Sequence, residues 1–209
     1  MTDKPLSGRR VFFLGAEGPH GRRIAVVLGE SGAAVELVSL SCSKDAEFVL
    51  NSIANEFWAF SGTAAVRLMD LFDPRATGGL ADAFEADIVV THVLHGPGAA
   101  DPRNAVVQLD TFLWRVVERR FGFAIVQVVG GDPEGAGYQV AAEELVQRTL
   151  RISQSGRARA CVVILDGGMP SVLRPLIRQE RFEAPDPGLA ALAAIQRQLD
   201  GAALYVDGP

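Results

Sequence analysis

The sequence predicts an α/β fold: a Rossmann-like, doubly wound parallel sheet in one domain over residues 1–209. Short apolar segments with strand character alternate along the chain with segments of helical periodicity. This alternation favours a parallel sheet with helices on both faces. The segment Asp87–Leu94 is rich in consecutive branched apolar residues, as is typical of a strand buried on both sides. No internal repeat or linker divides the chain, and its length suits one domain with a full core.

The first half of the chain contains four apolar runs that we expect to be strands: Arg10–Leu14, Ala34–Leu40, Ala65–Leu71 and Asp87–Leu94. Helices are expected between them, from the turn after the first strand to about Ser31, then over Asp45–Phe60 and Gly78–Glu85. Within Asp45–Phe60 the larger apolar side chains fall roughly on one side: Phe48, Ile53, Phe57 and Phe60. This spacing predicts a helix with one face packed on the sheet.

The second half continues the alternation. We expect helices over Pro102–Arg120, Tyr138–Ser153 and Leu189–Leu199, and strands over Phe123–Val129, Ala160–Leu165 and Ala202–Val206. The first of these helices has a strong apolar stripe: Val106, Leu109, Leu113, Val116 and Val117. A period of about 3.6 residues cannot also point both Phe112 and Trp114 at the sheet. Because aromatic residues are enriched in interface cores, we expect one of the two in a subunit contact.

Composition excludes several classes of function. The net charge of -5 gives no electrostatic case for binding nucleic acid or an anionic membrane. No apolar run approaches the roughly 18 residues of a transmembrane helix, and the N-terminus lacks the apolar core of a signal peptide. Cys42 and Cys161 are far apart in the sequence and form neither a metal-binding nor a redox motif. We therefore expect a cytoplasmic protein with free thiols.

A glycine-rich turn, Gly15-Ala-Glu-Gly-Pro-His-Gly21, follows the first strand and leads into a helix. Such a turn suits close approach of the backbone to a pyrophosphate at a helix N-terminus. Glycines are common between a strand and a helix, so the turn alone is weak evidence for nucleotide binding.

Four segments in order resemble the short-chain dehydrogenases/reductases. The opening LSGRRVFFLGAEGPHGRRIAVVLGESGAAVELV resembles the family's first βαβ unit, in which Gly15 and Gly21 match the outer glycines of GxxxGxG and Pro19 replaces the middle one. LMDLFD places Asp70 where the family's acidic residue holds the adenine. The helix starting at Tyr138 resembles the one that carries Tyr-x-x-x-Lys, and GAALYVDGP resembles the closing strand. The resemblance covers nearly the whole chain.

The residues that this resemblance makes catalytic are degenerate. Tyr138 is present, but Ala142 stands at the lysine position, and the serine position falls at Val129 or Gly130. The chain has lysine only at positions 4 and 44, and no serine or threonine between Phe112 and Arg148. An unperturbed tyrosine, with a pKa of about 10, is a poor base at neutral pH. We therefore expect Tyr138 to be structural and the chain to have no catalytic residue.

The cofactor positions are degenerate as well. Pro19 removes a backbone N–H from the turn. The family's NNAG motif reads Thr91-His92-Val93-Leu94, so that Leu94 places a bulky side chain where a glycine leaves room for the cofactor. The acidic residue that selects NAD aligns with Ser39 or its neighbours. We expect no cofactor on this chain, its remaining cofactor-site positions (Gly15, Pro19, Gly21, Asp70 and Leu94) being vestigial.

Other polar side chains offer weaker candidates. His92 and His95 are three residues apart at a strand end, and His20 could face them, so three imidazoles could bind zinc. The alternative, which we favour, is local hydrogen bonding with no metal. Asp132, Glu134 and Asp166 are loop acids with no pairing signal, and we expect them to be solvated.

These observations favour a non-catalytic subunit that assembles with a catalytic paralogue of the same family, with NAD or NADP held by the partner and a hydroxyacyl- or ketoacyl-type substrate. Both assembly surfaces implied by the resemblance survive: Pro102–Arg120 with Tyr138–Ser153, and Leu189–Leu199 with Ala202–Val206. The segment between Asp166 and Leu189 is shorter than the family's usual substrate-covering segment. We expect a hetero-oligomer, a heterotetramer by the family's habit. The chain resembles the inactive subunit of the hetero-oligomeric dehydrogenase that acts on a hydroxybenzylsuccinyl-CoA in anaerobic toluene degradation.

Two other functions stay open at this point. One is a divergent NAD(P)-dependent oxidoreductase that uses Tyr138 with a histidine. The other is a regulator that senses a nucleotide through Gly15, Gly21 and Asp70 without turnover. Pro19 and Leu94 count against both.

Overall fold

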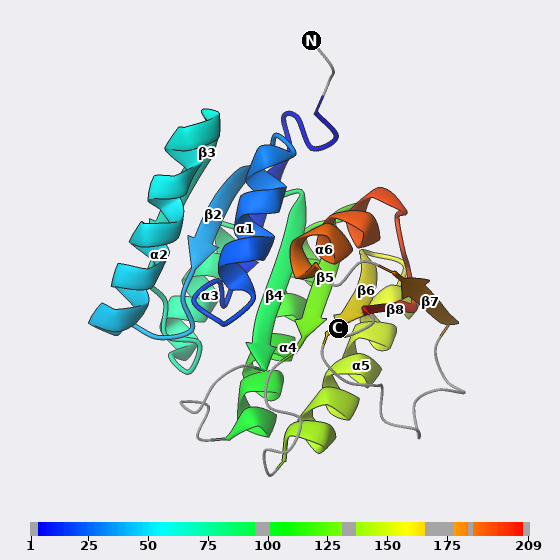
Figure 1. Cartoon of the computed structure of the whole chain (residues 1–209). Helices are drawn as coiled ribbons and strands as arrows, with labels where there is room; N and C mark the ends of the chain where they lie inside the picture. The colour runs from blue at the N-terminus through cyan, green and yellow to red at the C-terminus, as the bar shows by residue number, and fades with distance from the viewer. Residues whose placement is uncertain (1–3, 95–100, 131–136, 166–177, 184–185, 207–209) are drawn as a thin grey trace.

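A computed structural model describes residues 4–94, 101–130, 137–165, 178–183 and 186–206 of the chain. Its strands form one sheet in the order β3-β2-β1-β4-β5-β6-β8-β7, and every neighbouring pair is parallel. The strand order runs outward in both directions from the β1–β4 pair, which defines a doubly wound sheet. The predicted fold class is confirmed (Figure 1).

The elements follow one another in β-α alternation. The strands are β1 (Arg10–Leu14), β2 (Ala34–Val38), β3 (Thr63–Arg67), β4 (Ile88–Leu94), β5 (Ala124–Val129), β6 (Arg159–Ile164), β7 (Arg178–Phe182) and β8 (Ala202–Val206). The helices are α1 (Gly21–Glu30), α2 (Lys44–Glu56) with the 3₁₀ turn η1 (Phe57–Phe60), α3 (Pro74–Asp82), α4 (Pro102–Arg119), α5 (Tyr138–Gln154) and α6 (Pro187–Gln196).

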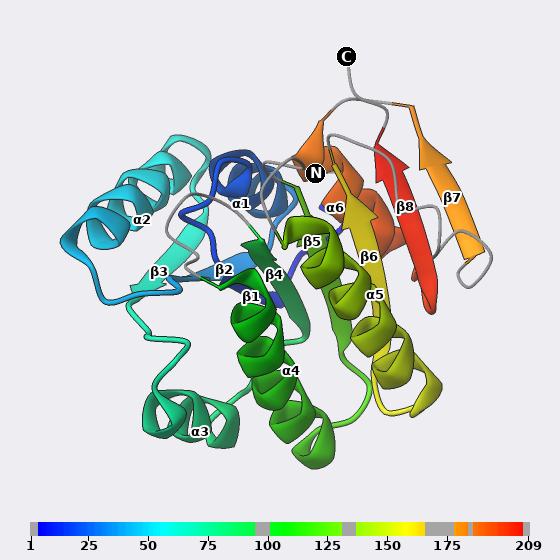
Figure 2. The same ribbon diagram turned by 90° about the horizontal axis from the view of Figure 1, so that it is seen from below.

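Helices cover both faces of the sheet. Helices α1, α2 and α6 lie on one face and α3, α4 and α5 on the other (Figure 2). Because successive side chains of a strand point to opposite faces, Phe12 belongs to the core under α4 and α5 while Phe13 belongs to the core under α1. All seven residues of β4 are buried, as expected of a central strand. In the described part of the chain, no helix is both long and apolar enough to span a bilayer.

Several helices begin where a side chain caps them. Asp73, Asp101 and Asp186 each accept a backbone N–H of the helix that follows, and a proline occupies its first turn each time. Ser43 caps α2 in the same way by accepting the N–H of Ala46. An acceptor at the N-cap followed by proline is a strong local signal for a helix start.

Some predicted details differ from the structure. Strand β3 ends at Arg67, so Asp70 lies in the following loop rather than in the strand. The helix expected over Asp45–Phe60 divides into α2 and η1, and Phe48 is 77% exposed, so its assignment to the sheet-facing side is wrong. Strand β7 was not expected. It pairs with β8, which therefore lies inside the sheet rather than at its edge.

The aromatic residues of α4 also need a correction. Phe112 is only 1% exposed and stacks on Phe12 with ring centroids 5.8 Å apart, so the expectation that it lies outside the sheet-facing stripe is wrong. The buried stripe of α4 is wide enough to include it. Trp114 is half-buried and packs partly on the same core. The predicted interface contact now depends on Trp114 alone and stays a prediction.

Candidate functional site

The candidate site lies at the carboxyl edge of the sheet, where β1 and β4 are neighbours although they are far apart in sequence. In open α/β sheets this switch point forms the crevice in which ligands bind. The turn after β1 and the ends of β2, β4 and β5 border it.

The glycine turn keeps its packing role. Gly15 has φ +82°, in the left-handed region, and its N–H donates to the Val38 carbonyl at 2.8 Å. A Cβ on Gly21 would lie 2.0 Å from the carbonyl oxygen of Ala16, so only glycine fits there. Gly15 is therefore required by its left-handed backbone and Gly21 by its close contact with Ala16.

Three positions of the turn offer no free N–H to a pyrophosphate. Gly18 N–H donates to Gly15 O at 3.2 Å, and Gly21 N–H donates to Gly18 O at 2.9 Å. Pro19 is exposed and carries no N–H. Phosphate binding at a helix start depends on several backbone N–H groups aimed at the ligand. Here the amides of Gly18 and Gly21 bond within the turn, and Pro19 provides none.

Glu17, within the turn, is a feature that the sequence interpretation missed. Its Oε1 accepts the N–H of Leu40 at 2.6 Å, just beyond the end of β2. Its Oε2 is buried and has no hydrogen-bond partner among the described residues. Burial raises the pKa of this carboxyl group, against the lowering effect of its backbone hydrogen bonds. An acidic residue inside a glycine turn, where a phosphate would add further negative charge, was the signal in the sequence.

Ser39 and Asp70 stand where the resemblance places the acidic residues that bind the ribose and the adenine. Their surroundings differ from those of such residues. Ser39 is fully buried, and its Oγ accepts the N–H of Met69 at 3.1 Å. Asp70 is exposed, and its Oδ1 accepts the N–H of Phe72 at 2.9 Å, which closes a local turn. Both side chains thus make bonds within the loops that follow β2 and β3.

Two imidazoles meet at the ends of β4 and β5. The rings of His20 and His92 have centroids 5.7 Å apart, so His20 faces His92 as the sequence suggested. His92 is fully buried, and its Nε2 lies 3.1 Å from the carbonyl oxygen of Gly130. No cluster of three metal-binding side chains exists among the described residues, and His95 lies outside them. Among the described residues, His92 thus has a local contact to the backbone of Gly130.

The serine position is closed by packing. Val129 is 3% exposed, and a Cβ on Gly130 would lie 2.9 Å from the Leu165 Cβ and 3.3 Å from the His20 Cδ2. A serine at position 130 would therefore require its neighbours to move. Leu94 pairs with Val129 in the sheet and is 2% exposed. Its side chain packs in the core under α4 and α5. Asp132, Glu134 and Asp166 lie outside the described residues.

The lysine position faces the protein interior. Tyr138 begins α5, is half-buried and packs against the core under α4 and α5. Ala142, one helical turn later, is 4% exposed and belongs to that same core. The two lysines, Lys4 and Lys44, are exposed on other parts of the fold.

No family model and no curated protein matches the chain. Solved structures do match. The RhlG–NADP active-site complex of Pseudomonas aeruginosa is 17% identical, with a TM-score of 0.69 over 100% of this chain and 98% of that one. A hydroxysteroid dehydrogenase from Escherichia coli is 16% identical, with a TM-score of 0.70 over 100% and 98%. A short-chain dehydrogenase/reductase from Serratia marcescens is 19% identical, with a TM-score of 0.69 over 98% of each chain.

The chain has the short-chain dehydrogenase/reductase fold. Within that fold, the structure brings the turn, Glu17, His20, His92 and Gly130 to one edge of the sheet. It places Ala142 in the core and Asp70 in an exposed loop. At the described positions that the resemblance assigns to the cofactor, Leu94 and Ala142 pack in the core, and Ser39 and Asp70 make bonds within the protein, which fits a dinucleotide poorly.

Proposed function

We propose that this chain is a non-catalytic member of the short-chain dehydrogenase/reductase family. Its role would be to assemble with and support a catalytic paralogue that acts on a hydroxyacyl- or ketoacyl-type substrate. The type of subunit remains the one indicated by the sequence, the inactive partner in a dehydrogenase of the hydroxybenzylsuccinyl-CoA kind. NAD or NADP would belong to the partner, and this chain would bind neither.

The main support for this proposal is the packing around Gly130 and Ala142. Carbonyl reduction in this fold needs a hydroxyl beside the substrate and a cation that lowers the pKa of the tyrosine. Gly130 has no room for a side chain beside Leu165 and His20, and Ala142 is buried in the core. Restoring activity would therefore take repacking as well as new residues, which supports a role other than catalysis.

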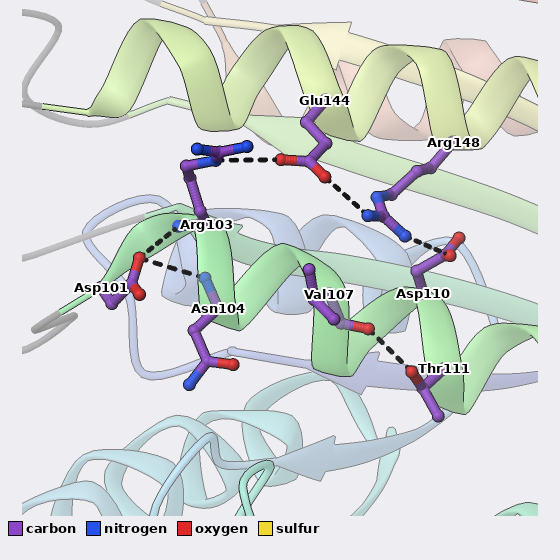
Figure 3. Close-up of polar contacts among 8 residues, drawn as sticks. All are labelled: Asp101, Arg103, Asn104, Val107, Asp110, Thr111, Glu144 and Arg148. Atoms are coloured by element: carbon purple, nitrogen blue, oxygen red, sulfur yellow. Dashed lines mark hydrogen bonds and ion pairs between the residues drawn. The ribbon is translucent and has the colours of Figure 1, made fainter.

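The helix pair α4–α5 supports the assembly part of the proposal. Arg148 on α5 bonds Asp110 on α4 at 2.5 Å and Glu144 at 2.6 Å, and Arg103 bonds Glu144 at 3.3 Å (Figure 3). This network holds the two helices in register. The outer side of α4 carries Val107, Thr111 and Trp114 at helical spacing, with Val107 37% exposed. It is the surface that we propose for the partner.

The second assembly surface expected from the sequence consists of α6 and β8, and strand β7 covers part of it. Because β7 covers the outer edge of β8, a partner would have to contact α6 rather than the edge of β8. Leu189 on α6 is 41% exposed and would be available for such a contact. The proposed heterotetramer would use both α4–α5 and α6.

The test is co-expression with a catalytic paralogue from the same genome, followed by native mass measurement. We expect a complex containing both chains, with the mass of a heterotetramer. Recovery of each chain only by itself, with both chains folded, would contradict the proposal.

The alternative, a divergent oxidoreductase, is favoured by one observation: His20 and His92 are paired at the edge where a substrate would bind. An imidazole there could exchange a proton with Tyr138 through the substrate. Tyr138→Phe distinguishes the two functions. If the chain only supports its partner, turnover by the assembled complex should stay within about twofold of wild type. A large fall in kcat with intact assembly would favour the alternative.

A further inference from the structure

The side chain of Glu17 crosses the space between the glycine turn and the end of β2. On one side its backbone belongs to the turn that joins β1 to α1. On the other, its carboxyl Oε1 accepts the N–H of Leu40 at 2.6 Å. The turn and the strand end are also tied directly by the Gly15 N–H, which donates to the Val38 carbonyl at 2.8 Å. The carboxyl group therefore adds a second link between the turn and the segment that follows β2.

In doubly wound sheets the place between this turn and the end of the second strand belongs to the adenosine half of a nucleotide. An acidic residue about 20 positions after the turn usually binds the ribose hydroxyls there. Here the end of β2 offers Ser39, which is fully buried and bonded to the N–H of Met69. Glu17 supplies a carboxyl group at this place from the glycine turn, and one of its oxygens accepts the Leu40 N–H.

We propose that Glu17 closes a latent site for an adenosine nucleotide and is the residue that excludes such nucleotides from this chain. The inference rests on the proposed function and gives a cause for its expected lack of cofactor binding. The Oε2 atom is buried, so the side chain fills the space instead of presenting an oxygen to a ligand.

Glu17 differs in this respect from Pro19. Pro19 is exposed and only removes one donor from the turn, whereas Glu17 bonds the Leu40 N–H across to the end of β2. Shortening Glu17 should therefore open the site even with Pro19 in place. Glu17→Gln is the matched control, because the amide keeps the length of the side chain and an oxygen that can accept the Leu40 N–H.

The experiment compares the wild-type chain with Glu17→Ala and Glu17→Gln, using adenosine 5′-monophosphate as the probe in NMR titrations. The Leu40 amide should exchange slowly with solvent in the wild type and in Glu17→Gln, and about tenfold faster in Glu17→Ala. The affinity for the nucleotide should rise by about tenfold or more in Glu17→Ala and stay at the wild-type level in Glu17→Gln. Glu17→Ser replaces the alanine variant if the latter does not fold.

Binding of the nucleotide to the wild-type chain, seen as shifts at Gly15 and Leu40, would overturn the proposal. So would a folded Glu17→Ala that binds no better than wild type, or a Leu40 amide that is unprotected in the wild type. The proposed subunit role would survive each of these results, because it is judged by formation of the complex. Conversely, loss of the complex would leave the Glu17 measurements unaffected.

Discussion

The environment of the Glu17 carboxyl group in the folded chain favours its neutral, protonated form. Because burial raises the pKa of its carboxyl group above the value in the unfolded chain, the native state binds a proton more readily than the unfolded state. The wild type should therefore lose stability as the pH rises from about 4, near the ordinary pKa of glutamate, through the raised pKa of Glu17.

Glu17→Gln should remove this loss of stability while keeping the Leu40 hydrogen bond. We expect the variant to be more stable than wild type near neutral pH, and the advantage to shrink as the pH falls toward about 4. Urea denaturation at several pH values measures the difference. A constant advantage at all pH values would mean that the carboxyl group does not titrate as the structure indicates.

Gly130 tests the closed serine position. Because its Cβ would lie 2.9 Å from the Leu165 Cβ, Gly130→Ser should overpack the site and cost about 1–3 kcal/mol of unfolding free energy. Gly79, on the exposed side of α3, has no atom within 4 Å of a Cβ and serves as the control. Gly79→Ala should stabilise α3 by about 0.5–1 kcal/mol. Thermal melts of both variants check the pair, and an unchanged melting temperature for Gly130→Ser would show that the site is open.

At the scale of elements, the α4–α5 pair depends on Arg148. The side chains of Arg148, Asp110 and Glu144 are 18%, 14% and 21% exposed, so their ion pairs are only weakly screened. Arg148→Met should cost about 2 kcal/mol, less than the loss for a fully buried pair. Arg119 pairs with Asp82 on the surface, and Arg119→Met should cost less than about 1 kcal/mol. Equal losses in the two variants, measured by urea denaturation, would contradict this reading of the network.

The same network has a pH dependence. The hydrogen bond from Arg148 lowers the pKa of the Glu144 carboxyl, with a further contribution from Arg103. The ionised Glu144 therefore stabilises the fold at pH values above the pKa of glutamate in the unfolded chain, about 4.3. This stabilisation is lost as the pH falls through the lower pKa of Glu144 in the folded chain. The Arg148→Met variant should therefore lose less unfolding free energy than wild type as the pH falls through this range.

The elements differ in how far the sequence alone could predict them. The central strands and α4 were predictable because burial imposes a clear apolar pattern, as in Ile88–Leu94. Strand β7 was not, because this edge strand carries charged residues such as Arg178 and Glu180 even on the face that it shares with Phe182, and they interrupt the apolar pattern. The glycine turn was located correctly from its spacing. The bond from Leu40 to Glu17 joins two segments through a side chain, which no local pattern encodes.

At the scale of the whole molecule, the outer side of α4 is the surface that we propose for a partner. Phe112 and Trp114 are two residues apart on α4 but have different environments. Phe112 is 1% exposed among Phe12 and Phe84, whereas Trp114 is half-buried beside the exposed positions Val107 and Thr111. A large aromatic ring that is part in the core and part at the surface is well placed to anchor a subunit contact.

Trp114→Ala should therefore lower complex formation more than it lowers the stability of the isolated chain. We expect a loss of about 1–2 kcal/mol in unfolding free energy, since part of the ring is already in water. Binding to the partner should fall by about tenfold or more, as is typical of a hot-spot residue.

Phe112→Ala is the matched comparison. It should cost about 3–5 kcal/mol of stability through the cavity it leaves, with little effect on association of the molecules that remain folded. Sedimentation of each variant with the partner separates the two effects, because it reports assembly while thermal melts report the fold. Unchanged assembly of a folded Trp114→Ala variant would reject α4 as the contact surface.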